Sequence, residues 1–111
     1  MVRISIKSLS LNQAYIGRRF ATPALKDFKM ALSLLLPKQT VPEGKLSVRL
    51  AFGVSSAGAD LDNQAKTMID ALSENYGFND NRVYKIEMEK IITKKGAEYI
   101  DFELLALQGD Y

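Results

Sequence analysis

Two aspartates separated by one residue, Asp60 and Asp62, are the residues of this sequence best placed to do chemistry. In an extended segment their carboxylates would point the same way, while Leu61 between them would point into the core. From Asp62 onward apolar residues recur every three or four positions, which is typical of an amphipathic helix. A helix that begins here favours ionised carboxylates, because its free N–H groups and its macrodipole place positive charge at its N-terminus.

A third acid, Asp80, follows after the predicted turn at residues 76–78. A hard divalent cation would relieve the repulsion between these carboxylates, and Mg²⁺ is usually held by one or two carboxylates together with waters and phosphate oxygens. A simpler interpretation is that Asp60 or Asp62 caps the helix and that Lys66 forms an ion pair with Asp62. The D-x-D pattern by itself favours this simpler interpretation.

The composition excludes several kinds of chemistry. The 111 residues contain no cysteine and no histidine, so disulfides, zinc-thiolate sites and Ser-His-Asp or Cys-His catalysis are excluded. The length fits one domain, residues 1–111, and the hydrophobic fraction of 47% fits a folded protein. No run approaches the roughly 20 apolar residues that span a membrane, and we see no secretory segment, so we expect a cytoplasmic location.

Charge is distributed unevenly along the chain. Residues 1–54 hold nine Lys or Arg against two acids, whereas residues 55–111 hold six against eleven. A metal-dependent nuclease needs such a division, because one part holds phosphates and the other holds the ion that activates them. An accident of solvated surface charge explains the same numbers equally well.

The predicted strands alternate apolar with polar or small residues. They are residues 2–6, 45–54, 83–93 and 97–107. We expect the last two to pair as a hairpin around the turn at residues 94–96.

The first helix is predicted from Pro23 to Leu36, because Thr22 suits the N-cap, proline suits the first position and Pro37 ends the helix. The second helix follows Asp60. The fold class is therefore expected to be α+β, with about four strands in a largely antiparallel sheet and two helices on one face.

Around the two aspartates the sequence resembles the RusA family of Holliday-junction resolvases, which are endonucleases of phages and prophages. The pattern is D-L-D-N-x-x-K-x-x-x-D-A-L, followed by G-F and D-x-x-V. The matching residues are Asp60, Leu61, Asp62, Asn63, Lys66, Asp70, Ala71, Leu72, Gly77, Phe78, Asp80 and Val83. Weaker similarity involves Asn12, Tyr15, Arg18, Arg19, Lys90, Lys94, Lys95 and Gly96. Relatives often carry Asp-Asp where this chain has Asn79-Asp80.

The resemblance implies a homodimer that cleaves four-way DNA junctions with Mg²⁺, for which Mn²⁺ could substitute. Asp60, Asp62 and Asp80 would then hold one or two ions and generate hydroxide from bound water. Lys66 would stabilise charge on the phosphoryl oxygens, although a surface ion pair with Asp62 or Asp70 explains it equally well.

Two polar residues of the pattern have less direct roles. Asn63 is expected to be a hydrogen-bonding support or part of the helix cap. Asp70 is expected to be structural rather than a ligand.

The segment of residues 8–21 lacks clean periodicity and is expected to be a loop that contacts DNA. Arg18 and Arg19 would hold phosphates, and Tyr15 would stack on an unpaired base. Alternatively, Tyr15 and Phe20 close over the core and the arginines are solvated. Asn12, Lys90, Lys94 and Lys95 complete the expected DNA-binding set.

Chain geometry limits how the three acids meet. The helix from Asp62 to Glu74 would rise about 18 Å, and the six steps to Asp80 would span at most about 20 Å. Asp80 must therefore lie nearer Asp70, or the helix must end early, or Asp80 must complete the site of a partner subunit. Two other function classes stay open: a different D-x-D phosphate-ester hydrolase, and a catalytically silent DNA-binding module.

Overall fold

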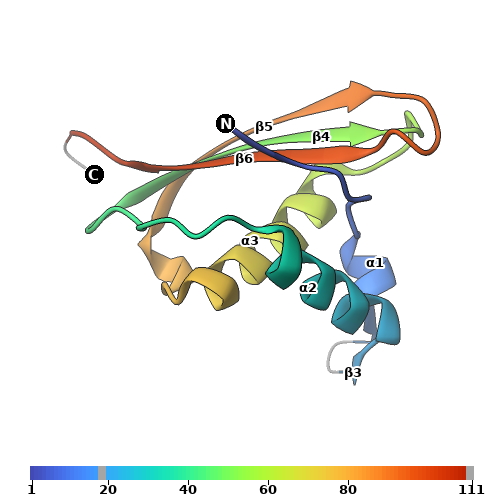
Figure 1. Ribbon diagram of the computed structural model, residues 1–111, viewed down its shortest axis with the longest axis horizontal. Coiled ribbons are helices and arrows are strands. Elements are labelled where there is room, and N and C mark those ends of the chain that lie inside the picture. The colour runs from blue at the N-terminus through green and yellow to red at the C-terminus, as the bar shows by residue number, and fades with distance from the viewer. Residues whose placement is uncertain (18–19, 110–111) are drawn as a thin grey trace.

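The structure of the protein, a computed structural model, describes residues 1–17 and 20–109. It is an α+β fold, as the sequence predicts. The elements in chain order are β1 (Val2–Ile4), α1 (Leu11–Ala14), β2 (Tyr15–Ile16), β3 (Phe20–Ala21), α2 (Pro23–Leu35), β4 (Leu46–Val54), α3 (Leu61–Tyr76), the 3-10 helix η1 (Asp80–Arg82), β5 (Val83–Ile92) and β6 (Tyr99–Ala106). The helices lie on one face of the main sheet, and the other face is open (Figure 1).

The main sheet has four strands in the order β1-β6-β4-β5. β6 pairs antiparallel with both β1 and β4, whereas β5 pairs parallel with β4. The predicted hairpin of the last two strands is therefore wrong, because β4 lies between them. The physical reason is burial: eight of the nine residues of β4 are buried, which places it at the centre of the sheet, and α3 serves as the crossover between β4 and β5.

The hydrophobic core lies between the sheet and the helices. β4 and β6 contribute the fully buried side chains of Phe52 and Phe102, and α3 contributes Met68 and Leu72. Because the apolar stripe of α3 packs against the sheet, its exposed residues, among them Asp62 and Lys66, face away from the core, whereas the polar residues Gln64 and Thr67 are buried. This packing fixes the direction in which the acidic residues of α3 can point.

Helix α2 agrees with the prediction. The side chain of Thr22 accepts a hydrogen bond from the N–H of Leu25, and Pro23 occupies the first turn. The backbone leaves the helical conformation at Leu36, one residue before Pro37.

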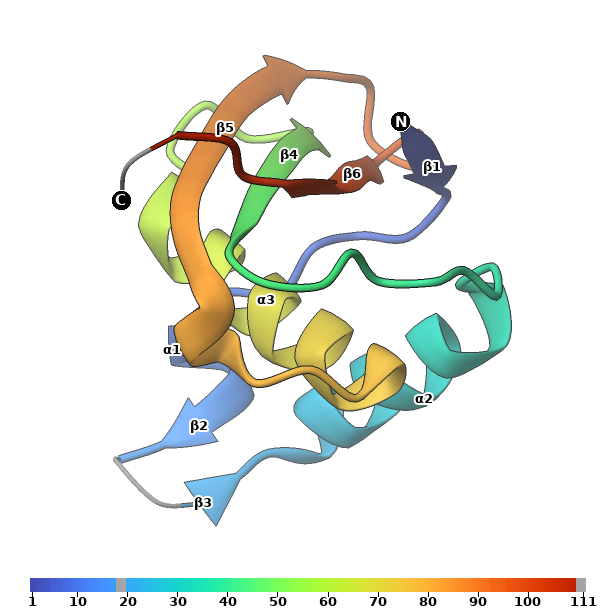
Figure 2. The ribbon, with the colours of Figure 1, turned by 90° about the vertical axis from the view of Figure 1, so that its left-hand side faces the viewer.

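The segment of residues 8–21 differs from the expected loop. It forms the short helix α1 and the paired strands β2 and β3, with Tyr15 opposite Ala21 and Ile16 opposite Phe20. This two-stranded ribbon projects beyond the helices (Figure 2). Arg18 and Arg19 lie outside the described residues.

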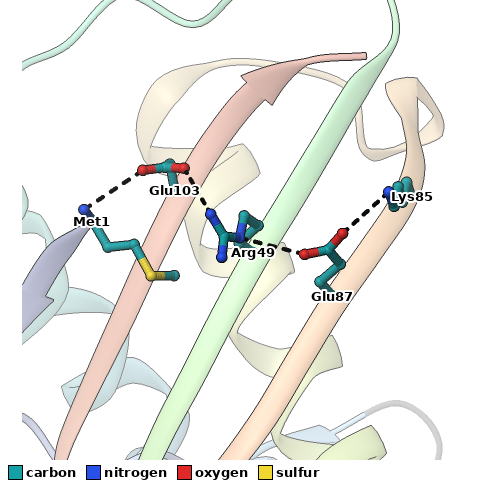
Figure 3. A network of polar contacts seen from close by, with 5 residues as sticks. All are labelled: Met1, Arg49, Lys85, Glu87 and Glu103. Atoms are coloured by element: carbon teal, nitrogen blue, oxygen red, sulfur yellow. Dashed lines mark ion pairs between the residues drawn. The ribbon is translucent and has the colours of Figure 1, made fainter. Parts of the chain in front are cut away.

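The charged groups on the open face of the main sheet form ion pairs with one another. The N-terminal amino group of Met1 lies 3.5 Å from Glu103, and Glu103 lies 3.6 Å from Arg49. Arg49 is 3.4 Å from Glu87, which is 3.1 Å from Lys85 (Figure 3). Each exposed pair contributes at most about 1 kcal/mol. Because acids alternate with cations here, this face is a poor surface for DNA phosphates.

Candidate active site

The N-terminus of α3 organises the first part of the site. Asp60 is the N-cap, and its carboxylate accepts the N–H of Asp62 at 3.2 Å and the side-chain amide of Asn63 at 3.3 Å. The capping interpretation is thus confirmed. It leaves the site open to a cation, because each carboxylate oxygen has two lone pairs and Asp62 is exposed in the first turn.

Lys90 positions the segment that leads into Asp60. Its Nζ donates to the backbone carbonyls of Ala57 at 2.7 Å and Ala59 at 3.1 Å. In the register of the sheet Lys90 lies beside Phe52, so it faces the helices. A cation on an edge strand therefore fixes the backbone just before the cap. A DNA contact by Lys90 stays a prediction.

A pocket of about 440 Å³ adjoins the cap. Its lining includes Asp60, Asn63 and Gln64 of α3, together with Ser10 and Asn12 of the N-terminal segment. Asn12, far from Asp60 in sequence, therefore shares a cavity with it, because α1 packs against both α2 and α3. The pocket brings polar side chains and a carboxylate together at the end of a helix.

Ser8 and Gln64 hold the floor of this pocket together. The Ser8 hydroxyl donates to the Gln64 side-chain oxygen, and both side chains are buried. Our sequence reasoning missed this pair. A usable signal was present, because Gln64 directly precedes Ala65 of the apolar stripe and a buried polar residue needs a partner.

The turn at residues 94–97 is tied to the end of β4. The carboxylate of Glu98 accepts the Gly96 N–H at 2.7 Å and the Ser55 hydroxyl at 3.1 Å. Hydrogen bonds from its own backbone N–H and from Gly96, with smaller contributions from Ser55 and Lys7, lower the pKa of Glu98. The exposed residues Lys94 and Lys95 therefore stand on an anchored turn whose Glu98 also lines the pocket.

The C-terminal half of α3 carries a second, different group of acids. Burial raises the pKa of Asp70, and the nearby carboxylates of Asp80 and Glu74 raise it further, while Lys29 and Lys66 act in the opposite sense. Asp80 thus lies close enough to Asp70 to interact electrostatically with it. Of the three arrangements that chain geometry leaves open, this is the one in which Asp80 lies nearer Asp70 within its own chain.

The three predicted metal ligands do not meet within one chain. From Asp60 to Asp70 the helix rises about 15 Å, and Asp80 lies beyond this point, close to Asp70. Residues 1–17 and 20–109 contain no group of three or more acids, histidines or cysteines that could hold a metal ion. An early end of the helix is excluded, because α3 continues to Tyr76 and ends at Gly77, which has a φ of 72°.

Asn79, where relatives often carry an acid, caps η1. Its side-chain oxygen accepts the N–H of Asn81 at 3.0 Å. An aspartate could accept the same bond. Asn79 therefore has a local structural role, and Asp80 is the acid of the Asn79-Asp80 pair.

The β2–β3 ribbon presents a different aromatic residue from the one expected. Tyr15 is half-buried, whereas Phe20 is 72% exposed and Ile16, opposite it, is 68% exposed. The alternative in which Phe20 closes over the core is wrong. DNA contacts by Tyr15, Arg18 and Arg19 stay predictions.

A protein-family model matches most of the chain. The family model described as endodeoxyribonuclease RusA matches residues 8–102. No curated protein matches the chain significantly. Within the part of the chain that the structure describes, the helices lack the length and apolar character needed to cross a membrane.

Proposed function

Because the chain belongs to the RusA family of endodeoxyribonucleases, we propose that it is a Mg²⁺-dependent endonuclease that resolves four-way DNA junctions. Paired symmetric nicks would serve recombination and repair in a bacterial cell or in the cytoplasm of a phage-infected one. The match over residues 8–102, which includes the capped carboxylates beside the pocket, carries this proposal.

Asp60 and Asp62 fit the requirements of a magnesium site. Both supply hard carboxylate oxygens, and Mg²⁺ takes one or two carboxylates with waters and substrate phosphate oxygens. Bound Mg²⁺ or Mn²⁺, as one ion or two, would lower the pKa of water and offset charge on the scissile phosphate. The bonds from Asp62 N–H and Asn63 hold the Asp60 carboxylate in place before any ligand arrives.

Lys66 is the residue that would stabilise charge on the phosphoryl oxygens. It is exposed on α3 one turn after Asp62, so its ammonium group can reach a phosphate on the surface. Asp70 lies one turn further along, half-buried with a raised pKa. These properties suit a structural residue better than a metal ligand.

A homodimer would bring Asp80 to the site. α3 separates Asp80 from Asp60 in one chain, so the third carboxylate would come from the partner subunit. Two such sites related by a two-fold axis can nick two opposed strands symmetrically, which leaves ligatable ends.

The DNA would lie against the pocket side of the molecule. Asn12 lines the pocket, and Lys94 and Lys95 stand on the turn beside it. Arg18, Arg19 and Tyr15 would add phosphate and base contacts from the β2–β3 ribbon. Lys90 would contribute mainly by holding the backbone before Asp60.

Cleavage of labelled four-way, forked and linear duplex DNA, with Mg²⁺ or with EDTA, tests the proposal. We expect paired nicks in the four-way junction with Mg²⁺ only. Asp60→Asn is the matched control, because asparagine also caps helices and so preserves the fold.

Each alternative gives a different result in the same assay. Junction binding unaffected by EDTA, with no cleavage at any Mg²⁺ or Mn²⁺ concentration, would identify a silent binding module. Equal cleavage of linear duplex would leave a nuclease but exclude a resolvase. Hydrolysis of small phosphate esters without DNA cleavage would identify a different D-x-D enzyme.

A further inference from the structure

The outer edge of β5 is the feature of the fold that the proposed chemistry leaves unexplained. In the described residues β5 pairs with β4 on one side and with no strand on the other (Figure 2). It is ten residues long, and every residue from Tyr84 to Ile92 is exposed. A long exposed edge of this kind is a template for pairing with another strand, and proteins usually protect it.

The side chains of β5 are also unusually apolar for an exposed strand. Ile86 is 44% exposed and Met88 is 37% exposed, although both lie in register with the core residues Val48 and Leu50. Their side chains therefore face the helix side of the sheet, beyond the part that α3 covers. The apolar face of the sheet thus extends to the unpaired edge strand β5, where it is exposed.

The backbone of β5 is oriented to accept a partner at Ile86. The N–H of Thr93 donates to the carbonyl of Val54, so alternate residues counted back from Thr93 turn toward β4. The residues between them, including Ile86 and Met88, turn their N–H and C=O groups outward.

A second copy of β5 fits this edge best when the two strands run antiparallel about a two-fold axis at Ile86. In that register Lys85 lies opposite Glu87 of the partner subunit, and Met88 lies opposite Tyr84 of the partner subunit. The pairs within two residues of the axis are then apolar or of opposite charge, and the next pair opposes Val83 and Glu89. An axis at Glu87 would place two glutamates face to face, and an axis at Met88 would oppose Glu87 and Glu89.

We propose that two copies of this chain associate through β5, antiparallel about Ile86, so that the two four-stranded sheets become one continuous sheet. This assigns a surface to the homodimer and therefore rests on the proposed function. In this register Val83 of the partner subunit, the first residue of its β5, lies opposite Glu89, next to Lys90, which holds the backbone before Asp60. Asp80 of the partner subunit precedes that strand by three residues, in η1.

A cysteine scan tests the register directly, because the natural chain has no cysteine. Hydrogen-bonded antiparallel partners have Cα atoms about 5.5 Å apart, within the range of about 4.4–6.8 Å that a disulfide spans. Ile86→Cys should therefore give a covalent dimer under mild oxidation, and Leu34→Cys, on the exposed face of α2, should remain monomeric on a denaturing gel. Crosslinking at Leu34 equal to that at Ile86, or none at Ile86, would overturn the proposal.

Sedimentation equilibrium of charge variants provides a second, independent test. Ile86→Lys places two like charges at the axis, and we expect its dimer dissociation constant to rise at least about 100-fold. Leu34→Lys adds the same charge to a residue that is 82% exposed and should leave dimerisation unchanged. A monomeric natural protein at all concentrations, or a dimer unaffected by Ile86→Lys, would contradict the interface.

Neither measurement depends on DNA cleavage, so the two proposals can fail separately. A dimer that crosslinks at Ile86 but never cleaves DNA would support the interface and reject the nuclease. A junction-cleaving protein whose dimer ignores changes at Ile86 would do the reverse.

Discussion

The two ends of α3 both carry acids, but in opposite surroundings. At the N-terminus the carboxylate of Asp60 is held by an N–H and an amide beside a pocket, with Asp62 exposed in the same turn. Further along, Asp70 is half-buried near Asp80 and Glu74, and its pKa is raised. The difference teaches that the surroundings of the acids, rather than their number, mark the end of the helix that suits a cation.

The largest effect on the cleavage rate is expected when one acid near each end of α3 is replaced and the two variants are compared. Asp62→Asn should lower the rate of junction cleavage at least about 100-fold, because it removes a carboxylate oxygen from the proposed metal site. Asp70→Asn on the same helix should change the rate less than about three-fold. Single-turnover cleavage at saturating enzyme measures both, and equal losses would remove the distinction between the ends.

A smaller effect should follow from loosening the backbone before the cap. Lys90→Met removes the bonds to Ala57 and Ala59, and we expect the cleavage rate to fall about ten-fold with little change in junction affinity. Lys29→Met is the matched control, since it breaks the exposed pair with Glu74 at the other end of α3. If Lys90 instead contacts phosphates, affinity and its salt dependence will change while the rate at saturation holds.

The free energy of unfolding should also depend more on contacts at the N-terminal end of α3 than on contacts at its C-terminal end. Ser8→Ala leaves the buried oxygen of Gln64 without its donor and should cost about 1–2 kcal/mol of unfolding free energy. Ser73→Ala, which removes a hydroxyl bonded to the Asp70 carbonyl within the helix, should cost less than about 0.5 kcal/mol. Urea denaturation compares them, and equal costs would argue that the buried pair has no special role.

The smallest effect concerns pH at the C-terminal half of α3. A carboxyl whose pKa is raised on folding contributes stability only while protonated, so Asp70 destabilises the native state at pH 7. Asp70→Asn should therefore raise the melting temperature by about 2 °C at pH 7, and the gain should shrink as the pH falls toward the ordinary value of 3.8. A gain that is independent of pH would rule out this cause.

Local patterns in the sequence predicted most of the fold. The Thr22-Pro23 start of α2, the alternation in β4 and the stripe of α3 each depend on residues a few positions apart, so the sequence carries them directly. The pairing of β5 with β4 rather than β6 was missed, because it depends on which strand is buried on both faces. Alternation alone does not report that property.

The site was predicted less completely than the fold. Asp60, Asp62 and Asn63 lie together because they are neighbours at one helix end, which spacing can predict. The position of Gln64 beside the apolar stripe signals a buried polar residue, but its partner Ser8 lies 56 positions away, and no local pattern identifies that partner. The position of Asp80 depends on the length of α3. The rise of the helix and the reach of the residues after it correctly predicted that a long α3 keeps Asp80 away from Asp60 in one chain.

The central claim is that Asp60 and Asp62 of one subunit act with Asp80 of the partner subunit. A heterodimer of an Asp60→Asn chain and an Asp80→Asn chain, purified through two different tags, tests it most directly. Such a dimer has one intact composite site, so we predict about one nick per junction where the natural dimer makes two. A heterodimer of Asp60→Asn and Asp62→Asn chains has no intact site and should be inactive. Absence of any nick by the first heterodimer, with both parent homodimers folded and bound to junctions, would contradict the account.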